Sequence, residues 1–196
     1  MQPPKSSLPL SAFETLQQLG ATMMATASGL PISDRVRSDW AGVIFLSGKQ
    51  MMLTPLVEVI EILPVHVLVS IPGTKPWLLG MATSRGEIFA VTDFRAFLSQ
   101  PLSTLTLESR ILVHRYKEEY SGFLVDRVLG LLRQSKSKIV KPENGTFAEY
   151  EDFVLGTIIY EHVVTPIISL ERIIQHPRFR DVTLREDELS LKEFEG

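Results

Sequence analysis

From Trp40 onward the chain consists of short apolar runs, rich in Val, Ile and Phe, that are separated by Gly and Pro. Runs of this length and composition predict β-strands, and the residues between them predict turns. Three pairs of runs have the form of hairpins, with turns at Ser47–Gly48, Arg85–Gly86 and Lys117–Glu119. So many short strands predict small β-barrels rather than a parallel βαβ sheet.

Two short segments in the same stretch have a helical pattern, DFRAFLSQ at residues 93–100 and SLERIIQH at residues 169–176. Each of them follows a strand, in EIFAVTDFRAFL and in HVVTPIISLERII. The similarity of these two patterns indicates two related halves. The expected fold class is therefore all-β with minor helices, built as two small barrels.

The two ends of the chain differ from this central part. Residues 1–10 are rich in Pro and Ser, and Ser11 and Glu14 have the spacing of a capping box, which predicts a helix that begins there. We expect the apolar face of this helix to pack on the protein's own barrel. The expected organisation is a leader and amphipathic helix over residues 1–38, one domain over 39–180, and an acidic helical tail over 181–196.

The composition excludes several kinds of protein. The chain has no cysteine, so it contains no disulfide and no thiolate metal site. Its net charge of −3 argues against nucleic acid as the main partner, because domains that bind phosphates are usually strongly basic. The beginning of the chain lacks the apolar stretch of a secretory signal, and no run approaches the roughly 20 apolar residues of a membrane helix. We therefore expect a soluble intracellular protein with no nucleic acid partner and no direct membrane insertion.

Motifs that carry enzymatic chemistry do not occur in the sequence. The four histidines lack a partner at the spacing of a metal pair, and the glycine patterns for phosphate binding or a nucleophilic serine are missing. The basic run Arg133–Lys141 and the triplet Asn144–Thr146 are interpreted as exposed surface and a turn. We expect no metal, no cofactor and no enzymatic activity. A barrel enzyme with an unrecognised site, or a nucleic-acid-binding barrel, is the alternative of another class.

Several short motifs follow one another over residues 42–174. They are VIEI at residues 59–62, IPGTKPWLLGMATSRGEIFAVTDFRAFL at 71–98, SGFLVDRV at 121–128 and FVLGTIIYEHVVTPIISLERII at 153–174. Each block alone is weak, but in this order they resemble the CheW adaptor family of bacterial chemosensory systems. The segment before Trp40 and the motif Lys75–Trp77 are similar to the branch of that family that serves type IV pilus twitching motility. A general flagellar chemotaxis adaptor is the alternative within the family.

The resemblance implies two SH3-like five-stranded barrels around a shared apolar core, with no active site. It also implies a non-enzymatic scaffold with two partners. One face of the first barrel would dock on the regulatory domain of a CheA-type histidine kinase. A groove between the barrels would receive the cytoplasmic tip of a methyl-accepting chemoreceptor. The protein would then be cytoplasmic and recruited to receptor arrays at the inner membrane.

The matching motifs supply the candidates for partner binding. They are Val59, Glu61, Gly80, Arg85, Gly86, Gly122, Val125 and Val128. Glu61 and Arg85 are expected to form a bidentate ion pair that pins the Arg85–Gly86 hairpin against the Val59 strand and fixes the docking face. Val59, Val125 and Val128 are candidates for the groove, although β-branched residues in strands more often belong to the core.

Overall fold

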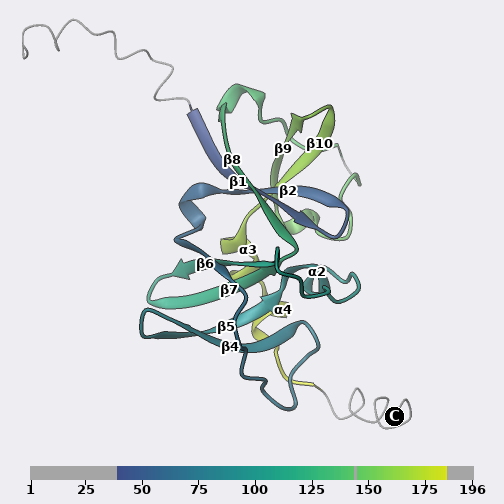
Figure 1. Cartoon of the computed structure of the whole chain (residues 1–196). Coiled ribbons are helices and arrows are strands. Elements are labelled where there is room, and N and C mark those ends of the chain that lie inside the picture. The colour runs from purple at the N-terminus through teal and green to yellow at the C-terminus, as the bar shows by residue number, and fades with distance from the viewer. Residues whose placement is uncertain (1–38, 144, 185–196) are drawn as a thin grey trace, which may run out of the picture. The chain divides into compact units, whose positions relative to one another are not determined.

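The computed structural model describes residues 39–143 and 145–184. Strands dominate this part of the chain and its helices are short (Figure 1), which confirms the expected all-β fold with minor helices. The strands are β1 (Asp39–Ser47), β2 (Gln50–Pro55), β3 (Glu61–Pro64), β4 (Leu78–Ser84), β5 (Glu87–Asp93), β6 (Arg110–Tyr116), β7 (Glu119–Val125), β8 (Arg127–Ser135), β9 (Val154–Tyr160) and β10 (Val163–Ile168). The helices are α2 (Phe94–Phe97), α3 (Leu170–Gln175) and α4 (Pro177–Arg180), with 3₁₀ turns η2 (Leu56–Glu58), η3 (Lys136–Lys138) and η4 (Glu151–Phe153).

The strands form two five-stranded sheets, and each is a small SH3-like barrel (Figure 1). The β3 barrel has the strand order β3-β6-β7-β5-β4, and the β1 barrel has the order β8-β1-β2-β10-β9. Neighbouring strands are antiparallel except for the parallel pairs β5–β7 and β2–β10. The described part of the chain thus begins in the β1 barrel, builds the whole β3 barrel, and returns to complete the β1 barrel.

The two barrels have the same arrangement of strands. Along the two sheets, β3 corresponds to β8, β6 to β1, β7 to β2, β5 to β10 and β4 to β9. A short helix follows the corresponding strand in both, α2 after β5 and α3 after β10. The related halves expected from the sequence are therefore present, but one of them is assembled from both ends of the domain.

Each barrel closes where the segment after one edge strand pairs with the other edge strand. After β3, Val69 exchanges two backbone hydrogen bonds with Met81 of β4, at 2.9 and 2.8 Å. After β8, Val140 exchanges the same two bonds with Thr157 of β9, also at 2.9 and 2.8 Å. Unpaired backbone groups on an edge strand can pair with other chains, so this closure protects both edges.

Closure brings a backbone carbonyl against a glycine in each barrel. A Cβ built on Gly80, the residue before Met81, would lie 2.4 Å from the Val69 oxygen. Gly80 also has a φ of +141°, a conformation that residues with a side chain rarely adopt. At the corresponding position of the β1 barrel, a Cβ on Gly156 would lie 3.0 Å from the Val140 oxygen. A glycine at these positions allows the closing segment to reach the edge strand.

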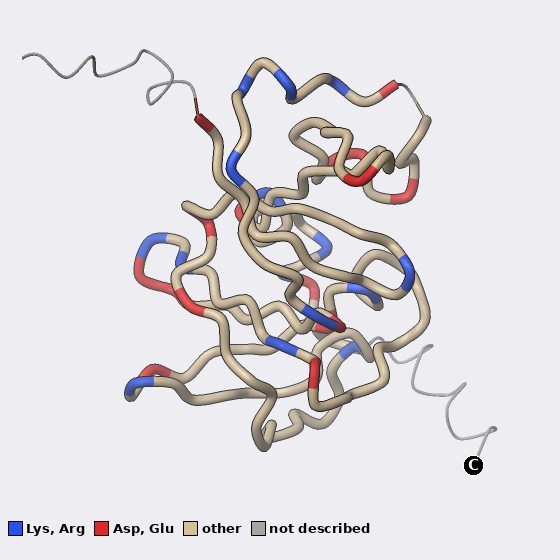
Figure 2. Tube along the Cα trace, turned by 45° about the horizontal axis from the view of Figure 1, so that its top comes forward, with Lys and Arg blue, Asp and Glu red and all other residues tan. Residues whose placement is uncertain are grey.

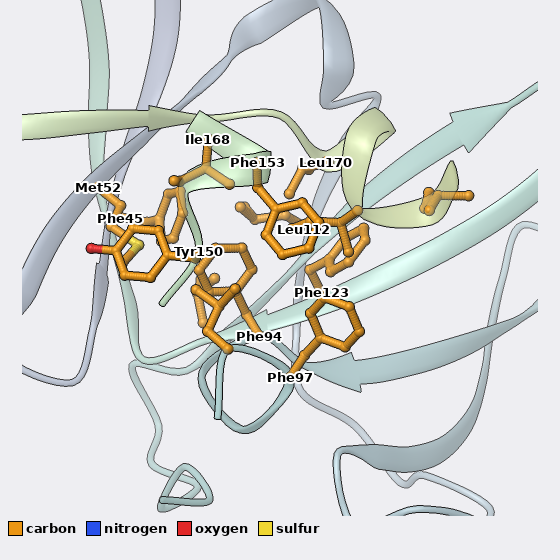
Figure 3. Packing of buried hydrophobic residues seen from close by; sticks show 14 of the residues in the cluster. Phe45, Met52, Phe94, Phe97, Leu112, Phe123, Tyr150, Phe153, Ile168 and Leu170 are labelled. Atoms are coloured by element: carbon orange, nitrogen blue, oxygen red, sulfur yellow. The ribbon is translucent and has the colours of Figure 1, made fainter. Parts of the chain in front are cut away.

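The largest apolar cluster lies between the two barrels (Figure 3). It combines Phe45 and Met52 of the β1 barrel with Phe94, Leu112 and Phe123 of the β3 barrel and its helix. The rings of Phe45 and Phe94 meet edge to face with centroids 5.2 Å apart. Each barrel also has a smaller core of its own. Because separating the barrels would expose the shared cluster to water, we expect them to fold as one unit.

Asp93, at the end of β5, is a fully buried carboxylate with several hydrogen-bond donors. Its Oδ1 accepts the backbone N–H groups of Arg95 and Ala96, at 3.0 and 3.1 Å, and so caps α2. The same carboxylate accepts the N–H of Ser103 at 2.7 Å and its hydroxyl at 2.9 Å. A buried charge is stable only with such partners, and here they attach the loop after α2 to the start of that helix.

A second carboxylate, Glu58 in η2, connects the two barrels. It accepts the Ser169 hydroxyl at 3.0 Å and the Glu171 N–H at 3.1 Å, at the start of α3. Its backbone oxygen lies 2.6 Å from Nδ1 of His114 on β6. The segment that leads from β2 into β3 is thus attached to a helix of one barrel and a strand of the other.

The hairpin turns and the second short helix agree with the sequence expectations to within one residue, whereas α2 ends three residues before the segment 93–100 that was expected to be helical. The hairpin turns are Gly48–Lys49, Arg85–Gly86 and Lys117–Glu118, and both expected short helices are present as α2 and α3. The amphipathic helix expected before residue 39 lies outside the described residues, as does the tail from Arg185 onward. The described part of the tail, Asp181–Leu184, is extended.

Gly80→Ala should destabilise the protein more than Gly86→Ala. Both glycines have a positive φ, +141° and +87°, so each substitution introduces about 1–2 kcal/mol of backbone strain. A Cβ at Gly80 would also collide with the Val69 carbonyl, whereas nothing lies within 4 Å of a Cβ at Gly86. We expect the free energy of unfolding to fall by about 3 kcal/mol or more for Gly80→Ala and by about 1 kcal/mol for Gly86→Ala, measured by chemical denaturation. Equal losses would show that the close approach is unimportant.

Candidate protein-docking surfaces

Glu61 and Arg85 form the expected ion pair and join the two edge strands of the β3 barrel. Glu61 is the first residue of β3, and Arg85 lies in the turn that follows β4. Arg85 Nη2 is 2.9 Å from Glu61 Oε1. The other oxygen, Oε2, accepts a hydrogen bond from the Ser84 hydroxyl at 3.3 Å. The carboxylate therefore holds two residues of the hairpin, in place of the bidentate contact to the guanidinium that the sequence led us to expect.

The two members of this pair differ in exposure. The Arg85 side chain is 81% exposed and that of Glu61 is 23% exposed. A pair this exposed contributes only about 0–1 kcal/mol to stability. The ion pair instead fixes the position of the hairpin turn relative to β3. Arg85 and Gly86, with φ values of +51° and +87°, form a tight two-residue turn of the kind common in β-hairpins.

A hollow of about 170 Å³ lies beside the ion pair. Its lining consists of Ile60, Glu61, Ser84, Arg85, Glu87, Phe89, Val113 and Tyr120. Four of these residues, Ile60, Glu61, Arg85 and Tyr120, are called the docking face. A hydrogen bond with Tyr120, and then the charge of Glu118, raise the pKa of the exposed Arg115 above its ordinary value. Arg115, like any arginine, is positively charged, and it lies opposite Tyr120 in the β6–β7 pair, next to this face.

The docking face lies on the β3 barrel, which is the second barrel to begin along the chain. The sequence resemblance implied a face on the first barrel. The difference arises because VIEI and the Arg85–Gly86 turn both come after the chain has left the β1 barrel.

The remaining candidate residues are buried or half-buried. Gly80, Gly122 and Val125 lie in the interior: Val125 is 1% exposed, and a Cβ on Gly122 would lie 2.7 Å from Ile111 Cγ2. A partner cannot contact these three without a rearrangement of the core, so we assign them to packing, which is the usual role of such residues inside strands. Val59 and Val128 are half-buried against the cluster between the barrels.

A group of exposed leucines was not identified from the sequence. Leu105 and Leu107 lie in the loop between α2 and β6, and Leu129 and Leu131 project from β8. Leu107 is 98% exposed and Leu131 is 63% exposed. We call these four side chains the leucine surface. The signal in the sequence is the stretch PLSTLTLES, where leucines occur among turn-forming residues and without the period of a strand or helix.

Hydrogen bonds hold the loop that carries Leu105 and Leu107. Arg95 donates through Nε to the Pro101 oxygen at 2.7 Å and through Nη2 to the Leu102 oxygen at 2.9 Å. Farther along, Arg110 Nη1 donates to the Leu107 oxygen at 2.8 Å. An ion pair between Glu108 and Arg127 joins the loop to the start of β8. Apolar side chains on a backbone fixed in this way are typical of an interaction site, because little ordering is needed on binding.

The described residues do not indicate a metal site. Within residues 39–143 and 145–184, no three His, Asp or Glu side chains are placed to hold a metal ion. In the same ranges, the helices are too short and too polar to cross a membrane. Lys and Arg are scattered among Asp and Glu (Figure 2). The basic run Arg133–Lys141 extends over the end of β8 and the loop after it.

Comparisons with known proteins identify relatives of this fold. The CheW-like domain matches residues 41–178. Protein PilI from Pseudomonas aeruginosa is 27% identical over 172 residues, which cover 88% of this chain and 96% of that protein. Protein FrzA from Myxococcus xanthus is 30% identical over 114 residues, which cover 58% of this chain and 71% of that protein. The crystal structure of the scaffolding protein TtCheW from Thermoanaerobacter tengcongensis has the same fold, with a TM-score of 0.62 and 22% identity over 67% of this chain and 84% of that chain.

The matched range contains both surfaces and extends from the third residue of β1 into α4. The barrels, their connections and the motifs that first suggested the family all lie within it. The chain therefore belongs to the CheW-like family, whose members are adaptor or scaffold proteins and not enzymes.

Proposed function

We propose that this protein is a chemosensory adaptor that couples a methyl-accepting chemoreceptor to a CheA-type histidine kinase. The observation that carries the proposal is a CheW-like fold with two distinct surfaces, the docking face and the leucine surface. The docking face lies on the β3 barrel alone, whereas the leucine surface combines a loop of the β3 barrel with β8 of the β1 barrel, which the Glu108–Arg127 ion pair joins. A scaffold with two such surfaces can hold two partners at the same time.

The docking face suits a folded partner domain. Ile60 is 52% exposed beside a hollow whose walls include the charged side chains of Glu61 and Arg85. A patch with apolar groups and a charged rim is the usual composition of a specific protein interface. The resemblance to the family supports the regulatory domain of the kinase, which has the same fold, as the partner.

The leucine surface suits an amphipathic helix. On β8 the exposed Leu129 and Leu131 are preceded in the chain by Arg127 and followed by Arg133, with a bulge against β1 at Leu129. A helix that places apolar side chains on the leucines can pair its acidic residues with these arginines. The helical cytoplasmic tip of the receptor is the partner that the family supports. The half-buried Val59 and Val128 pack against the cluster beneath the junction of the barrels.

Type IV pilus twitching motility is the pathway that the comparisons favour. The match to PilI covers 88% of this chain, whereas the matches to the CheW proteins of Helicobacter pylori and Bacillus subtilis cover 67% and 53%.

We expect deletion of the gene to abolish twitching on surfaces and to leave flagellar swimming unchanged, measured by paired motility assays with a complemented strain. Loss of swimming with normal twitching would favour the flagellar alternative.

Arg85→Glu should weaken kinase binding much more than it lowers stability. The substitution places a second carboxylate beside Glu61, so the hairpin is repelled from β3 and the docking face changes shape. Because the pair is exposed, stability should change by only about 0–1 kcal/mol. Binding to the kinase's regulatory domain should fall about tenfold or more, measured by titration calorimetry alongside thermal melts.

Lys117→Glu is the matched control for this variant. Lys117 occupies the turn of another hairpin of the β3 barrel with a φ of +55°, and it lies outside the docking face. Kinase binding should therefore survive the same change of charge there.

Adding Glu61→Arg to Arg85→Glu should restore part of the binding, and the cycle gives the coupling energy. Normal kinase binding by a folded Arg85→Glu protein would remove Arg85 from the docking face.

Leu107→Asp should weaken receptor binding and leave kinase binding intact. Leu107 is 98% exposed, so its replacement removes no core contact and stability should stay within about 0.5 kcal/mol. Val67→Asp is the control, because Val67 is an aliphatic side chain that is 89% exposed and lies in the segment between β3 and β4. Binding of a receptor tip fragment and of the kinase domain to the same preparation provides the measurement. Equal receptor binding by both variants would contradict a role for the leucine surface.

A further inference from the structure

The end of the described chain crosses onto the β3 barrel. The CheW-like domain matches only as far as residue 178, and Phe179 is the first residue beyond it. The Phe179 ring stacks on Trp77 with centroids 6.0 Å apart and lies against Phe97 and Phe123, with centroids 5.6 and 5.8 Å away. Arg178 Nη2 donates to the Ser99 hydroxyl at 3.1 Å, just after α2. These contacts attach α4 to α2 and to strands of the β3 barrel.

The residues after α4 then pair with the segment that precedes β4. We call Asp181–Leu184 the C-terminal strap. The N–H of Lys75 donates to the Val182 oxygen at 2.8 Å, and the N–H of Leu184 donates to the Gly73 oxygen at 2.9 Å. Lys75 Nζ also lies 2.7 Å from Asp181 Oδ2, and the Lys75 side chain is only 16% exposed. The strap thus holds Lys75 through both its backbone and its side chain.

Lys75 is connected to Asp93 by short backbone steps. The Lys75 oxygen accepts the N–H of Leu78 at 2.9 Å, and the oxygen of the intervening Trp77 accepts the N–H of Asp93 at 2.7 Å. The Asp93 carboxylate in turn holds the Ser103 N–H, two residues before Leu105. The strap, the turn before β4, the cap of α2 and the leucine loop therefore form one continuous series of hydrogen-bonded groups.

We propose that the C-terminal strap is a latch that keeps the loop of Leu105 and Leu107 in a single conformation. Its release frees Lys75, which loosens Trp77 and the position of Asp93, and the loop loses its anchor at Ser103. Physical contiguity by itself does not establish coupling between two sites, so the decisive observation is a remote effect of the strap on Ser103. The latch concerns how well the loop with Leu105 and Leu107 is ordered, and this property does not depend on the proposed function. Only an effect of the latch on receptor binding would rest on the proposed function.

Two truncations and one pair of point variants test the latch. A chain that ends at Leu184 keeps the strap, and a chain that ends at Arg180 lacks it but keeps Arg178 and Phe179. Leu184→Pro removes the N–H that binds the Gly73 oxygen, and Leu184→Ala keeps it. Amide hydrogen exchange, resolved by NMR at Lys75, Ser103 and Met81, provides the readout. Met81 is the internal reference, because its N–H bonds to Val69 on the same barrel and not to the strap.

In the chain that ends at Arg180, we expect the amides of Lys75 and Ser103 to exchange about tenfold faster, or more, than in the full chain. This is the effect of losing hydrogen bonds of ordinary strength. Exchange at Met81 should be unchanged. The chain that ends at Leu184 should exchange like the full chain, and Leu184→Pro should resemble the shorter truncation more closely than Leu184→Ala does. Faster exchange at Lys75 with unchanged exchange at Ser103 would overturn the latch. Equal acceleration at all three amides would also overturn it, because it would show a general loss of stability.

Discussion

The backbone pairing of Val69 with Met81, and of Val140 with Thr157, is the constraint on which both barrels depend. Five short strands in an open sheet would leave two unpaired edges and an uncovered core. Closing each sheet with the segment after its first edge strand solves both problems. In the β3 barrel it also brings the turn after β4 towards the start of β3, where Ser84 and Arg85 meet Glu61. The proposed docking face is therefore a consequence of closure, and Gly80 contributes to that face from the interior although no partner can touch it.

The second level of organisation is the contact between the barrels. The shared cluster, in which Phe45 packs against Phe94, removes apolar surface of both barrels from water at once. Polar ties complement it: Glu58 binds the start of α3, and Asp126, which links β7 to β8, accepts the Gly48 N–H at 2.5 Å. Because apolar contacts are not directional, we assign the stability of this junction mainly to the cluster and its geometry mainly to the polar ties. A leucine surface built from both sides of the junction depends on that geometry.

The sequence was informative where structure is local, and it was not where structure depends on distant pairing. Hairpin turns and the two short helices follow from nearby residues, and the Glu61–Arg85 contact followed from the motifs that carry the family resemblance. The return of β8 to pair with β1 is not encoded in any local pattern, and neither is the exchange of strands that makes the β1 barrel from both ends of the domain. Burial was equally hard to foresee for β7, β8 and their neighbours: Val125 is in the core, whereas Leu129, a few residues later, is exposed. Both are aliphatic residues in strands, and only the position of the other barrel distinguishes them.

An adaptor with one fixed conformation can hold two partners together, but it cannot make one of them sensitive to the state of the other. Allosteric coupling, typically worth about 1–3 kcal/mol, needs an element with two arrangements that both partners distinguish. The barrels are poor candidates for that element, because their cores are closed and close-packed. The connection between α2 and β6 is a better candidate. It carries exposed leucines, and its hydrogen bonds to Arg95 and Arg110 lie at the surface, where each can be exchanged for a bond to water at a modest cost. If the protein transmits a signal, the physical distribution of its contacts therefore places the responsive part in this loop and its supports, with the barrels as the rigid frame.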